Sequence, residues 1–140
     1  MRSKITFLLI YWFPPVILAG IIFILSSSTV PKASDIYWQD FIVKKIAHVI
    51  IYGILAVLIY RALIVGGTSK KKAVLMAFSL AAFYGATDEI HQYFIQGRES
   101  KLRDVVIDGI GASASLFFTT KVLPGLPKEL LELGKRLEII

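Results

Sequence analysis

The stretch from Ile5 to Leu25 holds 21 consecutive residues without a single charged side chain. A helix needs about 17–25 predominantly apolar residues to cross the hydrocarbon core of a bilayer. A helix on the surface of a soluble bundle carries a polar stripe along its exposed face, and this stretch has none. It therefore predicts a membrane-spanning helix, and the rest of the chain must be compatible with a bilayer.

Three more apolar stretches follow, and each is long enough for a span. They are Ile42–Val65, Ala73–Ile95 and Val105–Val122. Hydrophobic residues make up 56% of the chain and the mean hydropathy is +0.69, which is high for a soluble domain of 140 residues. We predict an all-α, polytopic membrane protein in which residues 1–140 form one domain with four transmembrane helices. A soluble four-helix bundle is the alternative, and the first stretch argues against it.

The first stretch also has features of a secretory signal peptide. Arg2 and Lys4 precede its apolar core, and the small residues Ser26–Ser28 follow it. The apolar core is nevertheless longer than the roughly 7–15 residues of a signal peptide. We interpret it as a retained span that Pro14 and Pro15 bend, since neighbouring helices can satisfy the freed carbonyl groups.

The basic residues are unevenly divided between the two predicted sides of the membrane. Ten of the sixteen lie in the N-terminus, in the turn at 61–72 and in the tail from 121. Positive residues favour the cytoplasmic side, so we expect a multi-pass protein of the cell membrane with both termini in the cytoplasm. Seven of the ten acidic residues fall on the outer half. The net charge of +6 therefore comes from basic residues on the cytoplasmic side, where they can contact anionic lipid headgroups. The sequence contains no nucleic-acid recognition motif.

The tail after Pro127 has the pattern of a short amphipathic helix. Leu130, Leu133, Leu137 and Ile140 form one apolar stripe, and charged residues lie opposite. We expect this helix to lie in the interface at the inner membrane surface. A frayed terminus is the alternative.

Ionisable residues occur well inside three of the predicted spans. At a rise of about 1.5 Å per residue, Asp88 lies about 10 Å below a helix end at Ile95, and His48 lies about 12 Å below a start at Asp40. Asp108 lies one turn into the fourth stretch. A charged side chain at the bilayer centre costs about 2.5–3.5 kcal/mol on insertion scales, so these groups must be paired or hydrated.

Helical spacing places these residues on shared faces. The predicted polar faces comprise Lys44, Lys45, His48 and Tyr52 on the second helix, Tyr84, Asp88, Glu89, His91 and Gln92 on the third, and Asp104 and Asp108 on the fourth. Phe83, Ile90 and Phe94 point away from the polar face and are expected to face lipid. Small residues such as Gly85 and Gly111 accompany the polar faces and permit close helix packing. We therefore expect the polar faces to converge on one pocket inside the bundle.

Four polar motifs follow one another along the chain. They are Ile24-Leu25-Ser26-Ser27, then Lys45-x-x-His48-x-x-x-Tyr52, then Asp88-Glu89-x-His91-Gln92-x-Phe94 with Gly97-Arg98, and finally Asp104-x-x-x-Asp108-x-x-Gly111. In this order they resemble the VanZ-like family of small integral membrane proteins over nearly the whole chain. The family pattern more often has Asn at the position of Asp108, and a carboxylate there changes the charge balance. The resemblance implies a role in the cell envelope, linked to tolerance of teicoplanin-type glycopeptides, and specifies no reaction.

Two hypotheses for the pocket stay open. In the first, it binds a membrane lipid, an anionic lipid-linked envelope component or a lipoglycopeptide at the outer leaflet, because arginine and lysine suit phosphate and carboxylate groups. The candidate ligand-binding residues are Lys45, His48, Tyr52, Asp88, Glu89, His91, Gln92, Arg98, Asp104 and Asp108. In the second, the protein is an intramembrane enzyme that performs acid/base transfer or hydrolysis on a lipid-linked substrate, with Glu89 or His91 as base and His48 as acid.

Neither hypothesis requires a cofactor. The chain has no cysteine, which excludes disulfides, thiolate chemistry and cysteine-ligated metals. A metal-assisted variant of the enzyme would use the two histidines with nearby carboxylates, a ligand set that suits zinc, manganese or magnesium. Two histidines alone give this variant little support, so no metal site is predicted.

The polar residues also have structural interpretations. The cations expected to balance Asp88, Glu89 and Asp108 are Lys44, Lys45 and Arg98. Such pairs can act purely as a pin between helices, but ionisable residues inside a membrane usually mark function, so we favour a pocket. For Asp104 we favour the role of helix N-cap, and for Ser26–Ser28 that of ending the first helix. A bundle this small is also compatible with a homodimer.

Overall fold

The structure, a computed structural model, describes residues 3–28, 35–98 and 100–140. These residues form helices and connections, with no strand among them. Four helical stretches are long and apolar enough to cross a membrane: Lys4–Ser26, Tyr37–Val65, Lys70–Tyr93 and Leu102–Gly125. The prediction of four spans and an all-α fold is confirmed, although the second helix starts earlier than expected, at Tyr37.

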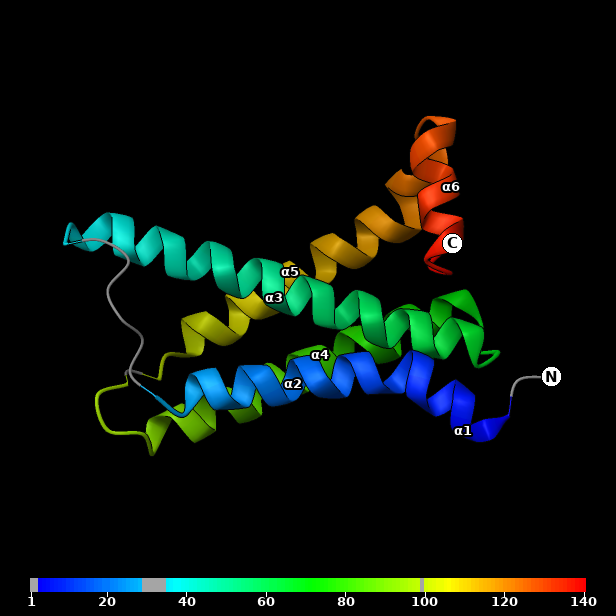
Figure 1. The fold of residues 1–140 in the computed structure, drawn as a ribbon. Helices are drawn as coiled ribbons and strands as arrows, with labels where there is room; N and C mark the ends of the chain where they lie inside the picture. The colour runs from blue at the N-terminus through cyan, green and yellow to red at the C-terminus, as the bar shows by residue number, and fades with distance from the viewer. Residues whose placement is uncertain (1–2, 29–34, 99) are drawn as a thin grey trace.

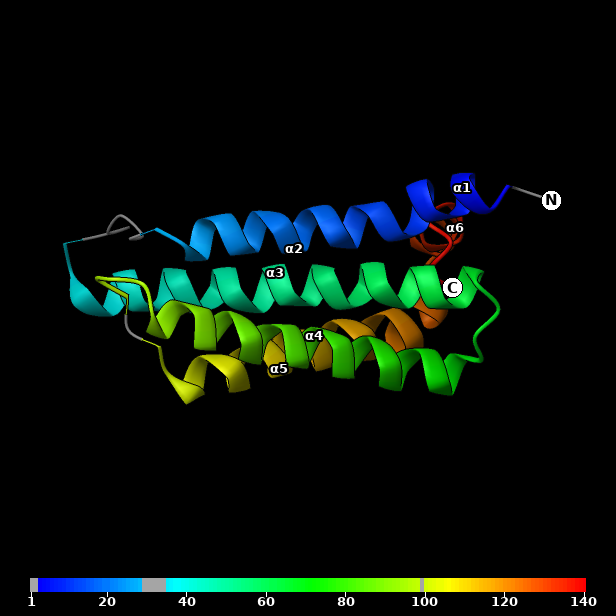
Figure 2. The ribbon, with the colours of Figure 1, turned by 90° about the horizontal axis from the view of Figure 1, so that it is seen from below.

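The spans lie side by side as an elongated bundle (Figure 1, Figure 2). The helix α3 (Tyr37–Val65) is central, because it packs against both α4 (Lys70–Tyr93) and α5 (Leu102–Phe117). The helix α2 (Phe13–Ser26) packs more sparsely against α3 and α4. The first span is therefore the peripheral helix of the bundle.

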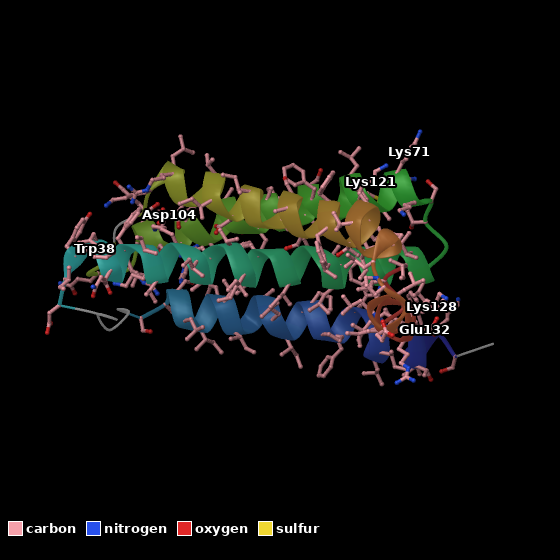
Figure 3. The ribbon with its side chains drawn as sticks, turned by 90° about the horizontal axis from the view of Figure 1, so that it is seen from above. Trp38, Lys71, Asp104, Lys121, Lys128 and Glu132 are labelled. Carbon is pink, nitrogen blue, oxygen red and sulfur yellow. The ribbon has the colours of Figure 1, made fainter. Side chains whose placement is uncertain are left out.

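Both chain ends lie at the same end of the bundle, which we call the terminal end (Figure 1). At the opposite end, the distal end, α2 and α4 finish and α3 and α5 begin. Trp38 and Asp104 mark the distal end, and Lys71 and Lys121 mark the terminal end (Figure 3).

The first span contains a π-helical turn just before its two prolines. It comprises α1 (Lys4–Phe7), a π-helical turn (Leu8–Trp12) and α2 (Phe13–Ser26). Pro14 and Pro15 lack backbone N–H groups, so the carbonyl groups one turn earlier lose their usual donors. The N–H of Phe13 donates to the carbonyl of Leu8, five residues back, which is the hydrogen bond of a π-helix. As predicted, the serines end the helix, since its last residue is Ser26.

The helices α3 and α5 cross at very close range (Figure 1). A Cβ atom on Gly111 would lie 2.4 Å from the carbonyl oxygen of Val49. A Cβ atom on Gly53 would lie 2.2 Å from the Oγ of Ser115. A Cβ atom is therefore excluded at Gly111, where it would meet backbone, whereas at Gly53 the Ser115 hydroxyl would have to rotate away. These small residues set the crossing point, as small residues do in membrane helix pairs.

The packed face of α4 is a stripe of small residues that becomes polar toward the distal end. Ala73, Ala77 and Ala81 are fully buried, and Gly85 continues the four-residue spacing. The same stripe then reaches Asp88, which is also buried. A helix that packs this tightly along its terminal half thus carries its polar residues directly into the bundle.

The opposite face of α4 is apolar and exposed. Phe83, Ile90 and Phe94 are 70%, 62% and 76% exposed, which confirms that they point away from the bundle. In a bilayer Phe83 and Ile90 contact acyl chains, which are as apolar as they are.

The tail forms the predicted short helix at the terminal end. After α5 the chain passes through a π-helical turn (Phe118–Val122) and a 3₁₀ turn (Leu123–Gly125) into α6 (Lys128–Arg136). Leu130, Leu133 and Leu137 are all exposed, so the apolar stripe of α6 is not used for packing within the bundle.

Glu138 fixes the tail to the bundle. Its Oε2 accepts a hydrogen bond from the hydroxyl of Tyr11 at 2.7 Å and pairs with the guanidinium of Arg61 at 3.1 Å. The Arg61 guanidinium also lies 4.8 Å from the centre of the Tyr11 ring, a cation–π distance. The tail therefore supplies the carboxylate that neutralises an arginine near the terminal end of α3.

Candidate functional site

A cavity of about 480 Å³ opens at the distal end, between α2, α3, α4 and the start of α5. Seven of the ten predicted ligand-binding residues line it: Lys45, His48, Tyr52, Asp88, Gln92, Arg98 and Asp104. Polar faces from three helices thus meet at one place, as the helical spacing predicts. The residues predicted for the site that do not line the cavity are Glu89, His91 and Asp108.

Two ion pairs join α3 to α5 at the cavity. The Nζ of Lys45 lies 2.5 Å from Oδ2 of Asp104. About one turn further along each helix, Nδ1 of His48 lies 2.8 Å from Oδ1 of Asp108, and the Asp108 side chain is 1% exposed. Because Asp108 holds one ring nitrogen of His48, it fixes the orientation of an imidazole whose ring lines the cavity.

A second polar layer joins α3 to α4. Asp88 accepts a hydrogen bond from Nε2 of Gln92 at 2.8 Å and a long one from the hydroxyl of Tyr52 at 3.5 Å, both at the same oxygen. The Tyr52 ring stacks nearly parallel to the His48 ring, with 6.2 Å between centroids. The histidine and carboxylate layers are therefore in contact along one wall of the cavity.

Each of four buried carboxylates has one oxygen without a hydrogen-bond partner among the described residues. These oxygens are Oδ1 of Asp88, Oε1 of Glu89, Oδ1 of Asp104 and Oδ2 of Asp108. The Nε of Arg103 comes within 3.6 Å of the Asp104 oxygen, beyond hydrogen-bond range. Each of these oxygens can accept a further hydrogen bond, so the layer can take additional donors.

Arg98 connects the cavity to the first span. Its Nε donates to the carbonyl of Ser28 at 2.8 Å, and its Nη2 donates to the carbonyl of Leu25. These carbonyls lie in the last turn of α2 and just after it, where helix geometry leaves acceptors without partners. Burial lowers the pKa of Arg98, while the charges of Asp88 and Glu89 oppose that shift. Arg98 thus caps the peripheral helix and lines the cavity at once.

His91 and Glu89 lie outside the cavity lining. The Nε2 of His91 is 3.0 Å from the Oγ of Ser27, and its ring stacks on Phe23 at 4.4 Å, so it faces α2. Oε2 of Glu89 accepts a hydrogen bond from the backbone N–H of Lys101 at 2.9 Å, which fixes the connection into α5. The two residues hold neighbouring elements in place in this structure.

The expected ion pairs are corrected by the structure. Lys45 pairs with Asp104, Lys44 pairs with Asp40, and Arg98 binds backbone carbonyls, so none of the three forms the expected pair with Asp88, Glu89 or Asp108. The expected N-cap role of Asp104 is also wrong. The helix α5 begins at Leu102 with Lys101 at the cap position, so Asp104 lies inside the first turn.

Several lining residues were not singled out from the sequence. They include Tyr37, Phe41, Lys101 and Arg103. The Phe41 ring lies 5.4 Å from the Lys45 ammonium and 4.7 Å from the Arg103 guanidinium. The sequence could have indicated Tyr37 and Phe41, because their four-residue spacing to Lys45 places all three on the cavity face of α3.

Two other arrangements fit a site less well. Within the described residues, no three His, Asp or Glu side chains come together as metal ligands. A second hollow, of about 530 Å³, lies between α3 and α5, but its lining from Gly53 to Leu58 and from Ala114 to Thr119 is almost entirely apolar. The convergent polar groups that a specific site needs are found only at the distal cavity among these two hollows.

The sequence from 7 to 123 matches the model of a protein family described as VanZ/LLP1. The chain belongs to the VanZ/LLP1 family. The matched region contains all ten predicted site residues and ends before α6, so the tail helix lies outside the part that defines VanZ/LLP1 membership. No curated protein and no solved structure shows significant similarity to the chain.

Proposed function

We propose that this VanZ/LLP1 protein binds an anionic lipid-linked envelope component or a lipoglycopeptide in its distal cavity and contributes to tolerance of teicoplanin-type glycopeptides. The observation that carries the proposal is the charge of the lining, in which basic side chains outnumber acidic ones by five to three among the described residues. The basic residues are Lys44, Lys45, Arg98, Lys101 and Arg103, and the acidic ones are Asp40, Asp88 and Asp104. An excess of cations in a partly desolvated cleft attracts anions, and guanidinium groups bind phosphate or carboxylate bidentately.

The proposal places the distal end at the outer face of the cell membrane. Its support is the charge of the terminal end, which carries Lys70, Lys71, Lys72 and Lys121. Positive residues are retained on the cytoplasmic side of membranes, so both termini lie in the cytoplasm. The cavity then faces the outer leaflet, where lipoglycopeptides act.

Drug tolerance tests the proposal. Expression in a Gram-positive host should raise the inhibitory concentration of teicoplanin more than that of vancomycin, which lacks a lipid tail. Lys45→Met should abolish the effect, because it removes a lining cation, whereas the lipid-facing control Phe83→Leu should keep it. Equal tolerance to both drugs would indicate a general change of the cell wall and would count against a lipid-related site.

One observation favours a second candidate, an enzyme that performs acid/base transfer or hydrolysis on a lipid-linked substrate. A buried carboxylate, Asp108, holds one ring nitrogen of His48, and the ring lines the cavity. An aspartate that orients a histidine is a recurring arrangement for general acid/base work. The earlier candidates Glu89 and His91 lie away from the lining, so His48 is the acid/base residue of this variant. A purified lipid-linked precursor that is converted by the protein, and not by His48→Gln, would establish it.

A further inference from the structure

Exposed aromatic residues mark the membrane interface at the distal end. Tyr37 and Trp38 at the start of α3 are 79% and 60% exposed, and Tyr93 and Phe94 at the end of α4 are 75% and 76% exposed. Tryptophan and tyrosine concentrate at the headgroup level of bilayers. Arg98 follows this belt within one turn of chain, so the cations of the cavity rim lie at the level of lipid phosphates.

Arg98 lines the cavity, and its guanidinium binds backbone carbonyls and no carboxylate among the described residues. Its hydrogen bonds go to the neutral carbonyl oxygens of Leu25 and Ser28. Among the described residues, no carboxylate lies within ion-pair distance of its guanidinium. Arg103 also lines the cavity, with its side chain half exposed and its Nε 3.6 Å from Oδ1 of Asp104. Two guanidinium groups at the rim therefore have donors to offer to a phosphate, whose geometry they match.

Below the rim, the cavity has an apolar wall on one side. Ile22 and Leu25 of α2 and Ala47 and Ile51 of α3 line it. Both helices present exposed apolar side chains to the bilayer on either side of this wall. The cavity is therefore cationic at the headgroup level and apolar where it meets the hydrocarbon, which is the pattern of an amphiphile.

The cavity has a volume of about 480 Å³, toward the lower end of the range of about 300–1,000 Å³ that ligand pockets span. A slender chain with a compact headgroup fits this space, whereas the cross-linked peptide of a glycopeptide drug does not. Ligand pockets bury most of their ligand, so a bulky occupant would have to remain outside.

We infer that the ligand of the distal cavity is a lipid with a phosphate headgroup and a slender chain, held at the rim by Arg98 and Arg103. The chain lies against the α2–α3 wall and leaves into the bilayer. This inference rests on the proposed function and narrows it, because it assigns the cavity to a lipid phosphate and not to the lipoglycopeptide itself.

Binding by the purified full-length protein in nonionic detergent tests the inference with four probes: farnesyl phosphate, farnesol, inorganic phosphate and teicoplanin. Farnesyl phosphate should bind at least about tenfold more tightly than farnesol or inorganic phosphate, a difference of about 1.4 kcal/mol. Arg98→Gln should weaken farnesyl phosphate binding about tenfold or more by the same conversion. Lys71→Gln, at the terminal end, should leave it unchanged (Figure 3).

Each of the other possible outcomes contradicts a particular part of the inference. Equal binding of farnesol would mean that only the chain is recognised, and equal binding of inorganic phosphate would mean a site for a free anion. Binding of teicoplanin without farnesyl phosphate would overturn the ligand class and leave the proposed function standing, whereas binding of no probe would overturn both. If Arg98→Gln does not fold, Arg103→Gln serves instead, because the contacts of Arg103 are with Asp104 and Phe41 and not with the backbone of α2. Unchanged binding of farnesyl phosphate in that variant would contradict the role of the arginines at the rim.

Discussion

The Nδ1 of His48 lies 2.8 Å from the Oδ1 of Asp108, and this contact ties α3 to α5 inside the membrane-spanning region. Asp108 is almost fully buried, and Gly85 of α4 leaves the space that its second oxygen needs. A Cβ atom at Gly85 would lie 3.1 Å from that oxygen. The pair thus depends on three helices, although only two of them supply its atoms.

Two substitutions at Asp108 distinguish the contribution of its hydrogen bond with His48 from the contribution of its negative charge. Asp108→Asn keeps an acceptor oxygen for His48 and should lower stability by less than about 1 kcal/mol, whereas Asp108→Leu leaves a buried donor without a partner and should cost about 1–3 kcal/mol. Thermal unfolding in detergent measures both variants. An equal loss in the two would show that the charge, and not the acceptor, holds His48.

The close crossing of α3 and α5 can be tested by replacing either of two glycines of α5 with alanine and comparing the two variants. Gly111→Ala forces a Cβ atom to within 2.4 Å of Val49 and should destabilise the fold by about 1–3 kcal/mol through overpacking. Gly109→Ala meets no atom within 4 Å and should be neutral or stabilising by up to about 1 kcal/mol, because alanine favours helix. Folded yield and melting temperature report the difference. Similar values for the two variants would mean that α3 and α5 do not approach this closely.

The cap that Arg98 places on α2 should control local opening of the first span. Arg98→Gln removes donors from the carbonyls of Leu25 and Ser28, so amide hydrogens near the end of α2 should exchange faster. Hydrogen exchange read by mass spectrometry over residues 20–28 measures this. Arg103→Gln is the control, since its contacts are with Phe41 and Asp104, and it should leave that exchange unchanged.

The orientation of the bundle gives a prediction at two sites. A reporter that is active only in the cytoplasm should work when fused after Ile140 and when inserted between Gly66 and Gly67, because both sites lie at the terminal end. The same reporter placed between Phe94 and Ile95 should be silent. Activity at only one of the two terminal-end sites would be incompatible with four spans.

Hydropathy and helical spacing were enough to predict the four spans and the layer in which polar residues gather. The reason is that 20 apolar residues have few alternatives to a span, and a helix face follows directly from its period. The helical period also placed Gly85 and Gly111 on the polar faces, where the helices pack closely. Sequence also predicted the outward direction of Phe83 and Ile90, which are exposed.

Partners across helices could not be read from the sequence in the same way. A helical period gives the face of a residue, but the crossing angle and the axial offset of two helices decide what it meets. Lys45 therefore forms an ion pair with Asp104, whereas Asp104 was expected to be the N-cap of the fourth helix. Arg98 and Glu89 bind backbone groups of neighbouring segments, and a sequence carries no pattern for such contacts. The contact of Glu138 with Tyr11 and Arg61 spans nearly the whole chain and was missed for the same reason.

The distal cavity is proposed to be a functional site and more than a pin between helices. The double variant Lys45→Met with Asp104→Leu tests it most directly, because replacing a buried ion pair by apolar residues of similar volume is often neutral or stabilising by about 1–4 kcal/mol. Teicoplanin tolerance is measured beside the melting temperature of the same purified protein. We predict that the melting temperature is kept and tolerance is lost. Tolerance equal to that of the unmodified protein, in a variant that folds as well, would show that the pair only pins α3 to α5 and would contradict the account.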